Sequence, residues 1–358
     1  MLEKILLGTP LAVEKNRLLG KVLSSKVLVA EIEANLSERV QKFYQQTNRL
    51  PLLATVQIGV DPASTTYVNM KIKACQRIGM LSKKLSFPDG DTMTTEKVIE
   101  VIKQLNDDDK IDGILLQHPL PSHINERECF DAIDISKDVD GVTSVGYGKL
   151  AMGEPAYGSA TPSGIMALLH HYGIEIEGKH AVIVGRSPIL GKPMAAMLLN
   201  KNATTTICHS KTQGLSNFII QADIIIGAVG KPNFIKDEWI KDGAVVIDAG
   251  YHPELKTGDI ELNTIKTRCL AYTPVPGGVG PMTIAMLIQQ TVDAAEKKIV
   301  KKLENISSDN HLIDRERLQE KSNNQVFFQP ITTEKKTTLL SNEELDLAFT
   351  EQRNGQQV

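Results

Sequence analysis

The first part of the chain alternates short apolar runs with longer segments whose apolar side chains recur at helical spacing. Val22, Val29 and Leu36 belong to one such segment, which predicts an amphipathic helix. Asp61-Pro62 predicts the start of another, because aspartate caps a helix and proline suits its first turn. The predicted strands are 52–60, 83–87 and 111–117, and the predicted helices are 21–48, 61–79 and 94–106. This alternation predicts a parallel sheet.

The pattern starts again at Thr161, which together with Pro162 predicts a helix cap and its first turn. An apolar strand at 180–184 is followed by a turn with two glycines and by a helix at 193–199. Three further short apolar strands are predicted at 203–208, 222–228 and 244–247. This second half therefore has the pattern of a mononucleotide-binding unit.

We predict an α/β protein with two α/β domains and a cleft between them. The N-terminal domain, 1–160, would contain a parallel-type sheet, and 161–282 would form a Rossmann-like NAD(P)-binding domain. A helix at 283–302 is expected to complete the N-terminal domain. The polar segment 303–358 is predicted to be mostly disordered, with a capping-box pattern at 341–344 that would open a short helix.

Composition and charge exclude several classes of function. The net charge of −3 and a pI near 6.3 make nucleic acid and anionic membranes improbable partners. Four widely spaced cysteines without a C-x-x-C pair indicate reduced thiols, with neither a disulfide framework nor a metal site. There is no apolar run long enough to span a bilayer, and the first residues lack a signal-peptide core. We therefore expect a soluble cytoplasmic protein.

Tyr67 and Lys71 lie four residues apart on the helix that follows Asp61, so their side chains share one helix face. A phenol and an amine held together can bind a polar ring and move a proton beside it. The same spacing occurs in ordinary surface pairs of amphipathic helices. It also occurs in short-chain dehydrogenases, where the pair follows the glycine loop. Here the pair precedes that loop by more than a hundred residues, which counts against that class.

The strand at 180–184 leads into a loop that begins at Gly185 and ends at Gly191. Glycine permits a tight turn, and the exposed amides at the start of the next helix can hold phosphate. Arg186 and Ser187 stand where an adenosine ribose or its phosphate could lie. The next strand ends in Cys208-His209-Ser210-Lys211, without the carboxylate that NAD-specific folds place there. The loop therefore predicts NADP as the cofactor, although the spacing only partly meets the usual fingerprint and an ordinary turn is the simpler alternative.

Three more loops fall at the ends of predicted elements, where open α/β sheets place ligands. Gln117-His118-Pro119-Leu120-Pro121 follows a strand, and Lys137-Asp-Val-Asp140-Gly141 places acids beside a turn glycine. The loop from Tyr272 to Thr283 combines stiff prolines with three glycines. Each loop also has an explanation without a function. In the order given, these explanations are a turn amide, a solvated acidic turn and a linker that leads into a helix.

Taken together and in this order, these motifs resemble the bifunctional methylenetetrahydrofolate dehydrogenase/cyclohydrolase family over about residues 21–300. The strings that carry the resemblance are Asp61-Pro-Ala-Ser with Tyr67-Val and Lys71, Asp112-Gly-Ile with Gln117 and Pro119-Leu-Pro121, Lys137-Asp-Val-Asp140-Gly141, Gly185-Arg-Ser187 with Ile189, Gly191 and Pro193, Ala228-Val-Gly-Lys-Pro232, and Thr273-Pro-Val-Pro-Gly-Gly-Val-Gly-Pro-Met-Thr283. The last string is highly specific.

The resemblance implies oxidation of 5,10-methylenetetrahydrofolate to the 5,10-methenyl form with NADP, and hydrolysis of the latter to 10-formyltetrahydrofolate. It implies tetrahydrofolate derivatives as ligands and a homodimer formed through the nucleotide domain. Lys71 would be the proton-transfer lysine, with Tyr67 stacked on the folate ring, Gln117 tuning Lys71 and Asp140 anchoring the pterin edge. The remaining expected site residues are Pro276, Gly277 and Val279 for folate, and Gly185, Arg186, Ser187, Gly191 and Ser210 for NADP.

The sequence departs from the family pattern at several positions. His118 replaces a usual leucine, Ser159-Ala160 replaces a frequent Pro-Cys pair, and Ser163 replaces a frequent basic residue. About 20 extra residues at the front and nearly 60 at the end also distinguish the chain. Because His118 adjoins Gln117, the balance of the two activities stays open. A monofunctional dehydrogenase, or a non-catalytic folate or nucleotide sensor, is the alternative function.

Overall fold

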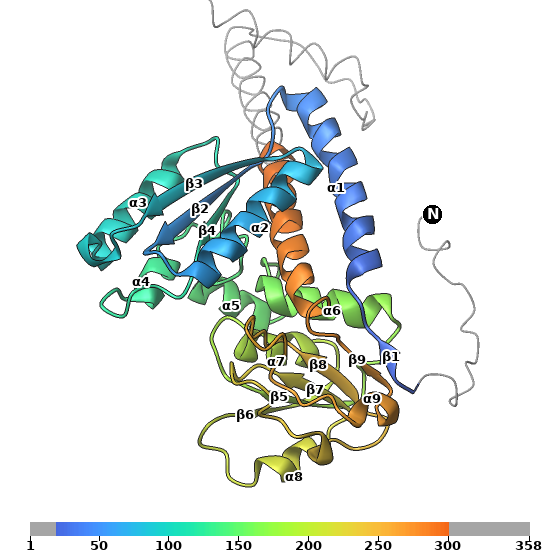
Figure 1. Ribbon diagram of the computed structural model, residues 1–358. Helices are drawn as coiled ribbons and strands as arrows, with labels where there is room; N and C mark the ends of the chain where they lie inside the picture. The colour runs from blue at the N-terminus through green and yellow to red at the C-terminus, as the bar shows by residue number, and fades with distance from the viewer. Residues whose placement is uncertain (1–18, 301–358) are drawn as a thin grey trace, which may run out of the picture. The chain divides into compact units, whose positions relative to one another are not determined.

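Two separate parallel sheets organise residues 19–300, which are the residues that this computed structural model describes (Figure 1). All of them belong to one compact unit of the chain. The α/β class and the parallel pairing predicted from strand–helix alternation are confirmed. The predicted disorder of 303–358 and the short helix at 341–344 lie outside the described residues.

The first sheet has three parallel strands in the order β3-β2-β4. They are β2 (Leu52–Ile58), β3 (Leu81–Phe87) and β4 (Gly113–Leu116). Alternate residues of β2 point to opposite faces. One face packs against α1 (Lys26–Thr47), α2 (Pro62–Ile78) and the helix at 279–300, and the other face packs against α3 (Thr95–Asp107) and α4 (Glu126–Asp131) (Figure 1).

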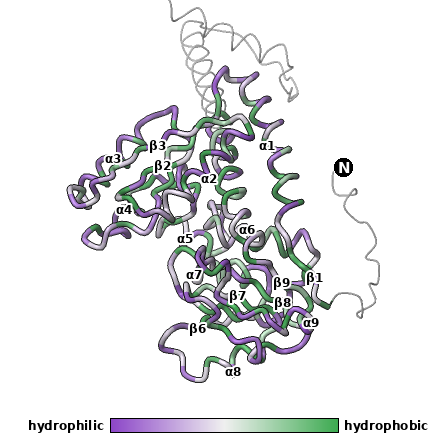
Figure 2. The backbone as a smooth tube through the Cα atoms, viewed as in Figure 1, coloured by the Kyte–Doolittle hydropathy of each residue, from purple (hydrophilic) through white to green (hydrophobic). Residues whose placement is uncertain are grey.

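The second sheet has six parallel strands in the order β1-β9-β8-β7-β5-β6. The strands are β1 (Lys21–Val22), β5 (His180–Val184), β6 (Thr204–Cys208), β7 (Ile224–Gly227), β8 (Val245–Asp248) and β9 (Ala271–Tyr272). Its central strands are hydrophobic along their length (Figure 2), because both faces are covered. One face packs against α6 (Ala160–His171) and α7 (Gly191–Leu199), and the other against α8 (Leu215–Ile219), η3 (Asp237–Trp239) and α9 (Ile265–Arg268).

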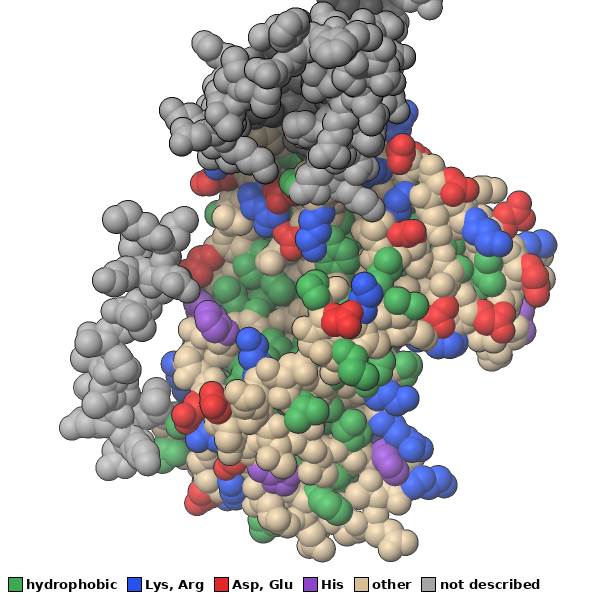
Figure 3. Space-filling view, turned by 180° about the vertical axis from the view of Figure 1, so that it is seen from behind, with side chains coloured by type: hydrophobic (Ala, Val, Ile, Leu, Met, Phe, Trp, Pro, Cys, Tyr) green, Lys and Arg blue, Asp and Glu red, His purple; other side chains and the backbone are tan. Residues whose placement is uncertain are grey.

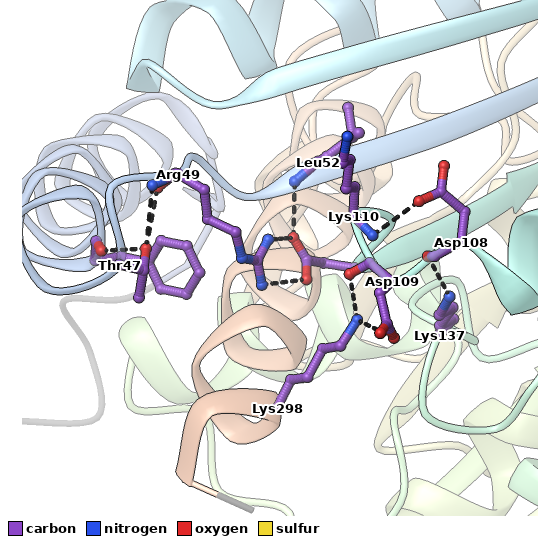
Figure 4. Close-up of polar contacts among 10 residues, drawn as sticks. Thr47, Arg49, Leu52, Asp108, Asp109, Lys110, Lys137 and Lys298 are labelled. Carbon is purple, nitrogen blue, oxygen red and sulfur yellow. Dashed lines mark hydrogen bonds and ion pairs between the residues drawn. The ribbon is translucent and has the colours of Figure 1, made fainter. Parts of the chain in front are cut away.

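The helix at 279–300 returns the chain from the second sheet to the first. Its buried side chains pack with those of α1 and α2, and Gln290 Nε2 donates to the carbonyls of Val139 (2.7 Å) and Gly158 (3.0 Å). Lys298, near the end of the described helix, contacts the backbone and carboxylate of Asp109 (Figure 4). The last helix therefore fixes both the loop that precedes β4 and segments that follow it.

A buried ion pair holds the start of the first sheet. Both guanidinium nitrogens of Arg49 bind the Asp112 carboxylate, at 2.7 and 2.9 Å, and Asp112 also accepts a hydrogen bond from Leu52 N at 3.0 Å (Figure 4). Asp112 is only 2% exposed, so the bidentate geometry is what compensates the cost of burying its charge. This carboxylate, which the family motif contains, is therefore structural.

Several boundaries predicted from the sequence are wrong. The helix predicted from residue 21 begins at Lys26, because Lys21–Val22 forms strand β1 and pairs with β9. The last helix begins at 279 and not at 283, because glycine and proline near its start hide the helical pattern. Thr161 is not a cap: α6 begins at Ala160 after Ser159, and Pro162 lies within its first turn. The sequence analysis also missed elements too short to show a periodic pattern, namely β1, β9, α4, α5 (Ser144–Ala151), α8, α9, η2 (Gly90–Thr92) and η3.

The described surface carries acidic and basic side chains close to one another, as the view from behind illustrates (Figure 3). Among the helices of residues 19–300, none combines the length and the apolar composition needed to cross a membrane. All four cysteines are buried and free.

Candidate functional site

Helix α2 presents Tyr67 and Lys71 together, as predicted. Asp61 caps the helix by accepting a hydrogen bond from Ser64 N at 2.6 Å, Pro62 occupies the first position, and left-handed Gly79 ends it. The amine of Lys71 lies 5.0 Å from the centre of the Tyr67 ring. The ring therefore faces the amine in a cation–π geometry.

Lys71 is 5% exposed, and its Nζ donates to Gln117 Oε1 at 3.0 Å. Gln117 follows β4, and its Nε2 donates to the carbonyl of His118 at 2.7 Å, which turns Oε1 toward the amine. Burial lowers the pKa of Lys71, and the nearby Asp140 carboxylate partly opposes this effect. The contact thus brings together two predicted site residues from separate elements.

Asp140 lies in a loop that buried hydrogen bonds hold rigidly. Lys137 Nζ donates to three carbonyls at the end of α3, at 2.6 to 2.9 Å, and Asp138 accepts from the amides of Val142 and Thr143. Gly141 has φ +65°, and a Cβ there would lie 2.4 Å from the backbone at Ser159. Lys137 and Asp138 therefore serve as scaffold for Asp140.

The departure from the family at Ser159 has a structural use. Ser159 is 3% exposed, and its hydroxyl donates to the carbonyl of Gly141 at 2.7 Å. The amide of Ala160 donates to the carbonyl of Asp140 at 3.2 Å. The start of α6 therefore fastens the Asp140 loop.

The charged groups of this cluster influence one another. Burial raises the pKa of Asp140 to about 6, although the Lys71 ammonium acts in the opposite direction. Burial also raises the pKa of the Tyr67 phenol, against the effect of the Thr283 hydroxyl. Burial lowers the pKa of His118; Glu126 acts against this and Lys71 reinforces it. Low-polarity surroundings thus favour the neutral form of each group.

The start of the last helix closes this cluster on one side. Tyr67 OH donates to the carbonyl of Gly280 at 3.3 Å, and the hydroxyls of Thr161 and Thr283 lie 3.0 Å apart. The sequence analysis gave Thr161 only the role of a helix cap and gave no role to Thr283, although Thr283 ends the most specific motif. The only signal for them was their position beside prolines at two helix starts.

The three other residues expected at the folate site lie just before or at this helix start. Pro276 is exposed, and the carbonyl of Gly277 accepts from both the amide and the hydroxyl of Ser25, at 2.9 and 2.8 Å. Val279 is 4% exposed and packs in the core of the six-stranded sheet. The side chain of Val279 is therefore not available to a ligand.

The glycine loop between β5 and α7 makes a close backbone turn. Gly185 has φ +141°, and a Cβ there would lie 2.1 Å from the carbonyl oxygen of Ala228. Ser187 Oγ accepts hydrogen bonds from the amides of Leu190 and Gly191, at 3.1 and 3.3 Å. Ile189 packs against the hydrophobic cluster of the first sheet. This loop therefore contacts the lobe formed by the first sheet and its helices, which contains Lys71.

Arg186 and Ser210 occupy matching positions on neighbouring strands. Val184 of β5 pairs with Cys208 of β6, and each of the two exposed residues lies two positions beyond its strand end. No carboxylate lies in the segment from Cys208 to Lys211. This edge therefore suits a dinucleotide whose adenosine ribose bears a phosphate, because nothing there repels a second negative charge.

The sequence analysis also missed a buried carboxylate network at the same edge of the sheet. Asp259 is fully buried; it accepts hydrogen bonds from the amides of Val229 and Gly230, at 2.6 and 2.9 Å, and pairs with His252 at 2.9 Å. Asp248 accepts from the amides of Gly250, Asp259 and Ile260, and burial raises its pKa to about 6. The network fixes the loop after β7.

In chemical terms, this geometry offers a buried amine with one acceptor, a partly exposed carboxylate beside it and an aromatic ring facing it. The carboxylate can accept two parallel N–H donors from a flat heterocycle, and the ring can stack on such a group. Burial lowers the pKa of the amine, which favours its neutral form, and a neutral amine can take up a proton. A dinucleotide loop on the second sheet contacts the same lobe.

Two family models match the chain. Residues 23–140 match "Tetrahydrofolate dehydrogenase/cyclohydrolase, catalytic domain", and residues 159–299 match "Tetrahydrofolate dehydrogenase/cyclohydrolase, NAD(P)-binding domain". The chain is 63% identical over 278 residues to the bifunctional protein FolD of Cellvibrio japonicus, covering 78% of this chain and 98% of that protein. It is 61% identical over 277 residues to FolD of Acidobacterium capsulatum, covering 77% and 97%.

Solved structures give the same result. The bifunctional FolD methylenetetrahydrofolate dehydrogenase/cyclohydrolase of Campylobacter jejuni has a TM-score of 0.75 and 41% identity, covering 78% of this chain and 99% of that one. The Trypanosoma brucei methylenetetrahydrofolate dehydrogenase-cyclohydrolase, complexed with NADP and an inhibitor, has a TM-score of 0.73 and 32% identity, covering 78% and 98%.

The raised pKa of Asp140 predicts a pH effect on stability. Its pKa rises from 3.8 to about 6, so the folded protein keeps this proton to higher pH than the unfolded chain. The charged form therefore destabilises the fold as the pH rises through this interval. Relative to wild type, Asp140→Asn should gain about 1 to 2 kcal/mol in unfolding free energy between about pH 4 and about pH 7.

Urea unfolding monitored by circular dichroism would measure this difference, with Asp91→Asn, at an exposed position, as the baseline. A relative stability of Asp140→Asn that stays level or falls across this pH range would contradict the raised pKa assigned to Asp140.

Proposed function

Because the chain belongs to the tetrahydrofolate dehydrogenase/cyclohydrolase family, we propose that its two reactions share one site, built around the Lys71–Gln117 contact. The enzyme oxidises 5,10-methylenetetrahydrofolate to 5,10-methenyltetrahydrofolate with NADP, and it hydrolyses the methenyl form to 10-formyltetrahydrofolate. The observation that carries the proposal is the buried amine of Lys71, held 3.0 Å from Gln117 Oε1.

Tyr67 and Asp140 hold the folate in this proposal. Asp140 accepts hydrogen bonds from the amino and ring N–H groups of the pterin, which is a bidentate use of one carboxylate. The face of the Tyr67 ring stacks on the substrate. The backbone at Pro276, Gly277 and Val279 lines the pocket, and the anchoring of Gly277 to Ser25 supports this role because it gives the loop one position.

Lys71 moves the proton in the hydrolysis step. A water molecule must lose a proton as it attacks the methenyl carbon, and an amine at its usual pKa is protonated near neutrality and cannot act as a base. Burial lowers the pKa of Lys71, and the positive charge of the methenyl group lowers it further. Gln117 orients the amine, and Lys71 then returns the proton to a ring nitrogen as the ring opens.

The oxidation step needs orientation more than proton transfer. Bound NADP supplies the hydride acceptor. The loop of Gly185, Arg186, Ser187 and Gly191 holds its phosphates and adenosine end, together with Ser210. Alignment of the reacting carbons at contact distance provides most of the remaining rate enhancement. The contact of Ile189 with the first lobe supports a short path between the two binding sites.

The alternative functions are less consistent with these contacts. A dehydrogenase without hydrolase activity has no need for a buried amine with a lowered pKa. A non-catalytic sensor would have no reason to retain one, because an unneutralised buried lysine costs stability. The Lys71–Gln117 pair thus supports the bifunctional enzyme.

The domain boundaries, the assembly and the location of the protein belong to the same proposal. We assign 1–160 with the last helix to the folate domain, which the shared packing of that helix with α1 and α2 supports. We assign 161–282 to the NADP domain.

A homodimer through this domain is supported by the open edge of β6, where Ile207 is 39% exposed. Four free thiols support the cytoplasm.

Replacing Lys71 tests the central assignment. Lys71→Gln keeps a polar side chain but removes the base, so cyclohydrolase activity should fall by at least about 100-fold while dehydrogenase activity falls much less. Both activities are measured spectrophotometrically, with NADP and with NAD. Lys73→Gln, at an exposed position of the same helix, is the matched control and should retain both activities. Full cyclohydrolase activity in Lys71→Gln would contradict the assignment, and equal loss of both activities would indicate a binding or structural role.

Replacing Ser210 tests the cofactor site. Ser210→Asp introduces a carboxylate that repels the 2′-phosphate of NADP and can bind the ribose hydroxyls of NAD. The ratio of kcat/KM for NADP to that for NAD should fall by about 10- to 100-fold. Ser210→Asn, with a neutral side chain of similar size, should change the ratio little. An unchanged ratio in Ser210→Asp would place the adenosine phosphate elsewhere.

A further inference from the structure

The face of β2 that points toward α2 carries two buried polar side chains. Thr55 is 1% exposed and Gln57 is 3% exposed. Within residues 19–300, Thr55 Oγ1 and Gln57 Oε1 are the buried side-chain oxygens without a hydrogen-bond partner. An unpaired buried carbonyl costs stability, so each such atom calls for a functional or structural reason. Gln57 is the stronger acceptor of the two.

Gln57 lies directly beside Gln117, the residue that binds the amine of Lys71. Val56 of β2 pairs with Leu116 of β4, and Gln117 N donates to the carbonyl of Val56 at 2.9 Å. The next residues of the two parallel strands, Gln57 and Gln117, are therefore neighbours in register, and they point to the same face of the sheet.

Gln57 also contacts the helix that carries Lys71. Its Nε2 donates to Thr65 Oγ1 at 2.8 Å, and Thr65 lies on the stripe of α2 that faces the sheet through Val68 and Lys71. The Nε2 group of Gln57 is therefore bonded to α2, whereas its Oε1 atom has no hydrogen-bond partner. Lysine side chains point toward the start of their helix, which directs the amine of Lys71 toward this level of β2.

Proton uptake changes what Lys71 requires. An ammonium has three donors and no acceptor, whereas the structure gives Lys71 Nζ one side-chain acceptor, Gln117 Oε1. The titratable groups around the amine are Asp140, His118 and Tyr67. Asp140 is committed to the pterin in the proposed complex. The protonated amine thus lacks a second acceptor, and the carbonyl of Gln57, on the strand beside Gln117, is unoccupied.

We propose that Gln57 is a positioning residue of the hydrolysis site, whose carbonyl accepts a hydrogen bond from the ammonium form of Lys71. This inference rests on the proposed role of Lys71 in proton transfer. In the hydrolysis step the attacking water gives one proton to Lys71, the new N–H donates to Gln57, and that proton later passes to the ring nitrogen. The second water proton leaves the hydroxyl for solvent as the formyl C=O forms and the C–N bond breaks. Gln57 exchanges no proton.

The test is the pH profile of kcat for hydrolysis of methenyltetrahydrofolate by the full chain, because kcat reports the pKa of Lys71 in the substrate complex. Gln57→Met removes the acceptor at similar length, so the ammonium is less stable and the midpoint for deprotonation of Lys71 should move down by about one pH unit. Gln57→Glu substitutes a stronger acceptor, and the midpoint should move up. Dehydrogenase activity should change by no more than a few fold in both variants.

Gln76→Met makes the same substitution at an exposed position of α2 and should leave the midpoint unchanged. Opposite shifts in the two Gln57 variants cannot arise from loosened packing, which would act in one direction. Midpoints that coincide with wild type, or that move together, would overturn the proposal. Retained hydrolysis in Lys71→Gln would instead remove its premise, so the two failures are distinguishable.

Discussion

The enclosure of one amine is the physical constraint on which the rest of this site depends. Lys71 is 5% exposed and donates to Gln117 Oε1, with the Tyr67 ring on one side and Asp140 close by. Water solvates an ammonium far better than this environment does, so the neutral form gains. The proton transfer proposed for Lys71 requires the opposite change during each turnover. The site must therefore disfavour the ammonium form of Lys71 without preventing that form from being reached.

Much of the surrounding structure serves to hold the few groups that set this balance. Gln117 is fixed by its own bond to the backbone of His118, and Asp140 by a loop that Lys137, Asp138 and Ser159 anchor. The helix at 279–300 bonds to the same loop through Gln290 and meets Tyr67 at Gly280. The chain segments that build the site are thus far apart in sequence, and the last helix links them.

The sequence predicted those elements in which local pattern and tertiary role agree. Strand β5 and helix α2, with its Asp61 cap, were predicted closely because apolar periodicity and capping indicate the same structure. The start of the last helix was misplaced, because Gly277, Gly278 and Pro281 conceal a helix that tertiary packing stabilises. Short elements such as β1 and β9 exist only through pairing with each other and with β8, which no local pattern records.

The same distinction applies to the site. The motifs identified Tyr67, Lys71, Gln117 and Asp140, and the structure brings these four residues into one cluster. They could not identify Thr283, Thr161 or the Asp259–His252 pair, whose partners come from distant segments. Gln57 is the clearest case, because an apolar strand with one buried amide looks ordinary until its unpaired carbonyl is located beside Gln117.

The most direct test of the account is the pKa of Lys71 itself, measured by NMR titration of protein labelled at the lysine side-chain carbons, with Lys71→Gln used to assign the signal. The account predicts a pKa clearly below the usual 10.5, and a further decrease when a cationic folate analogue is bound. A pKa at or above 10.5 would mean that the buried amine stays charged at neutral pH, and that its role as the base in hydrolysis is wrong.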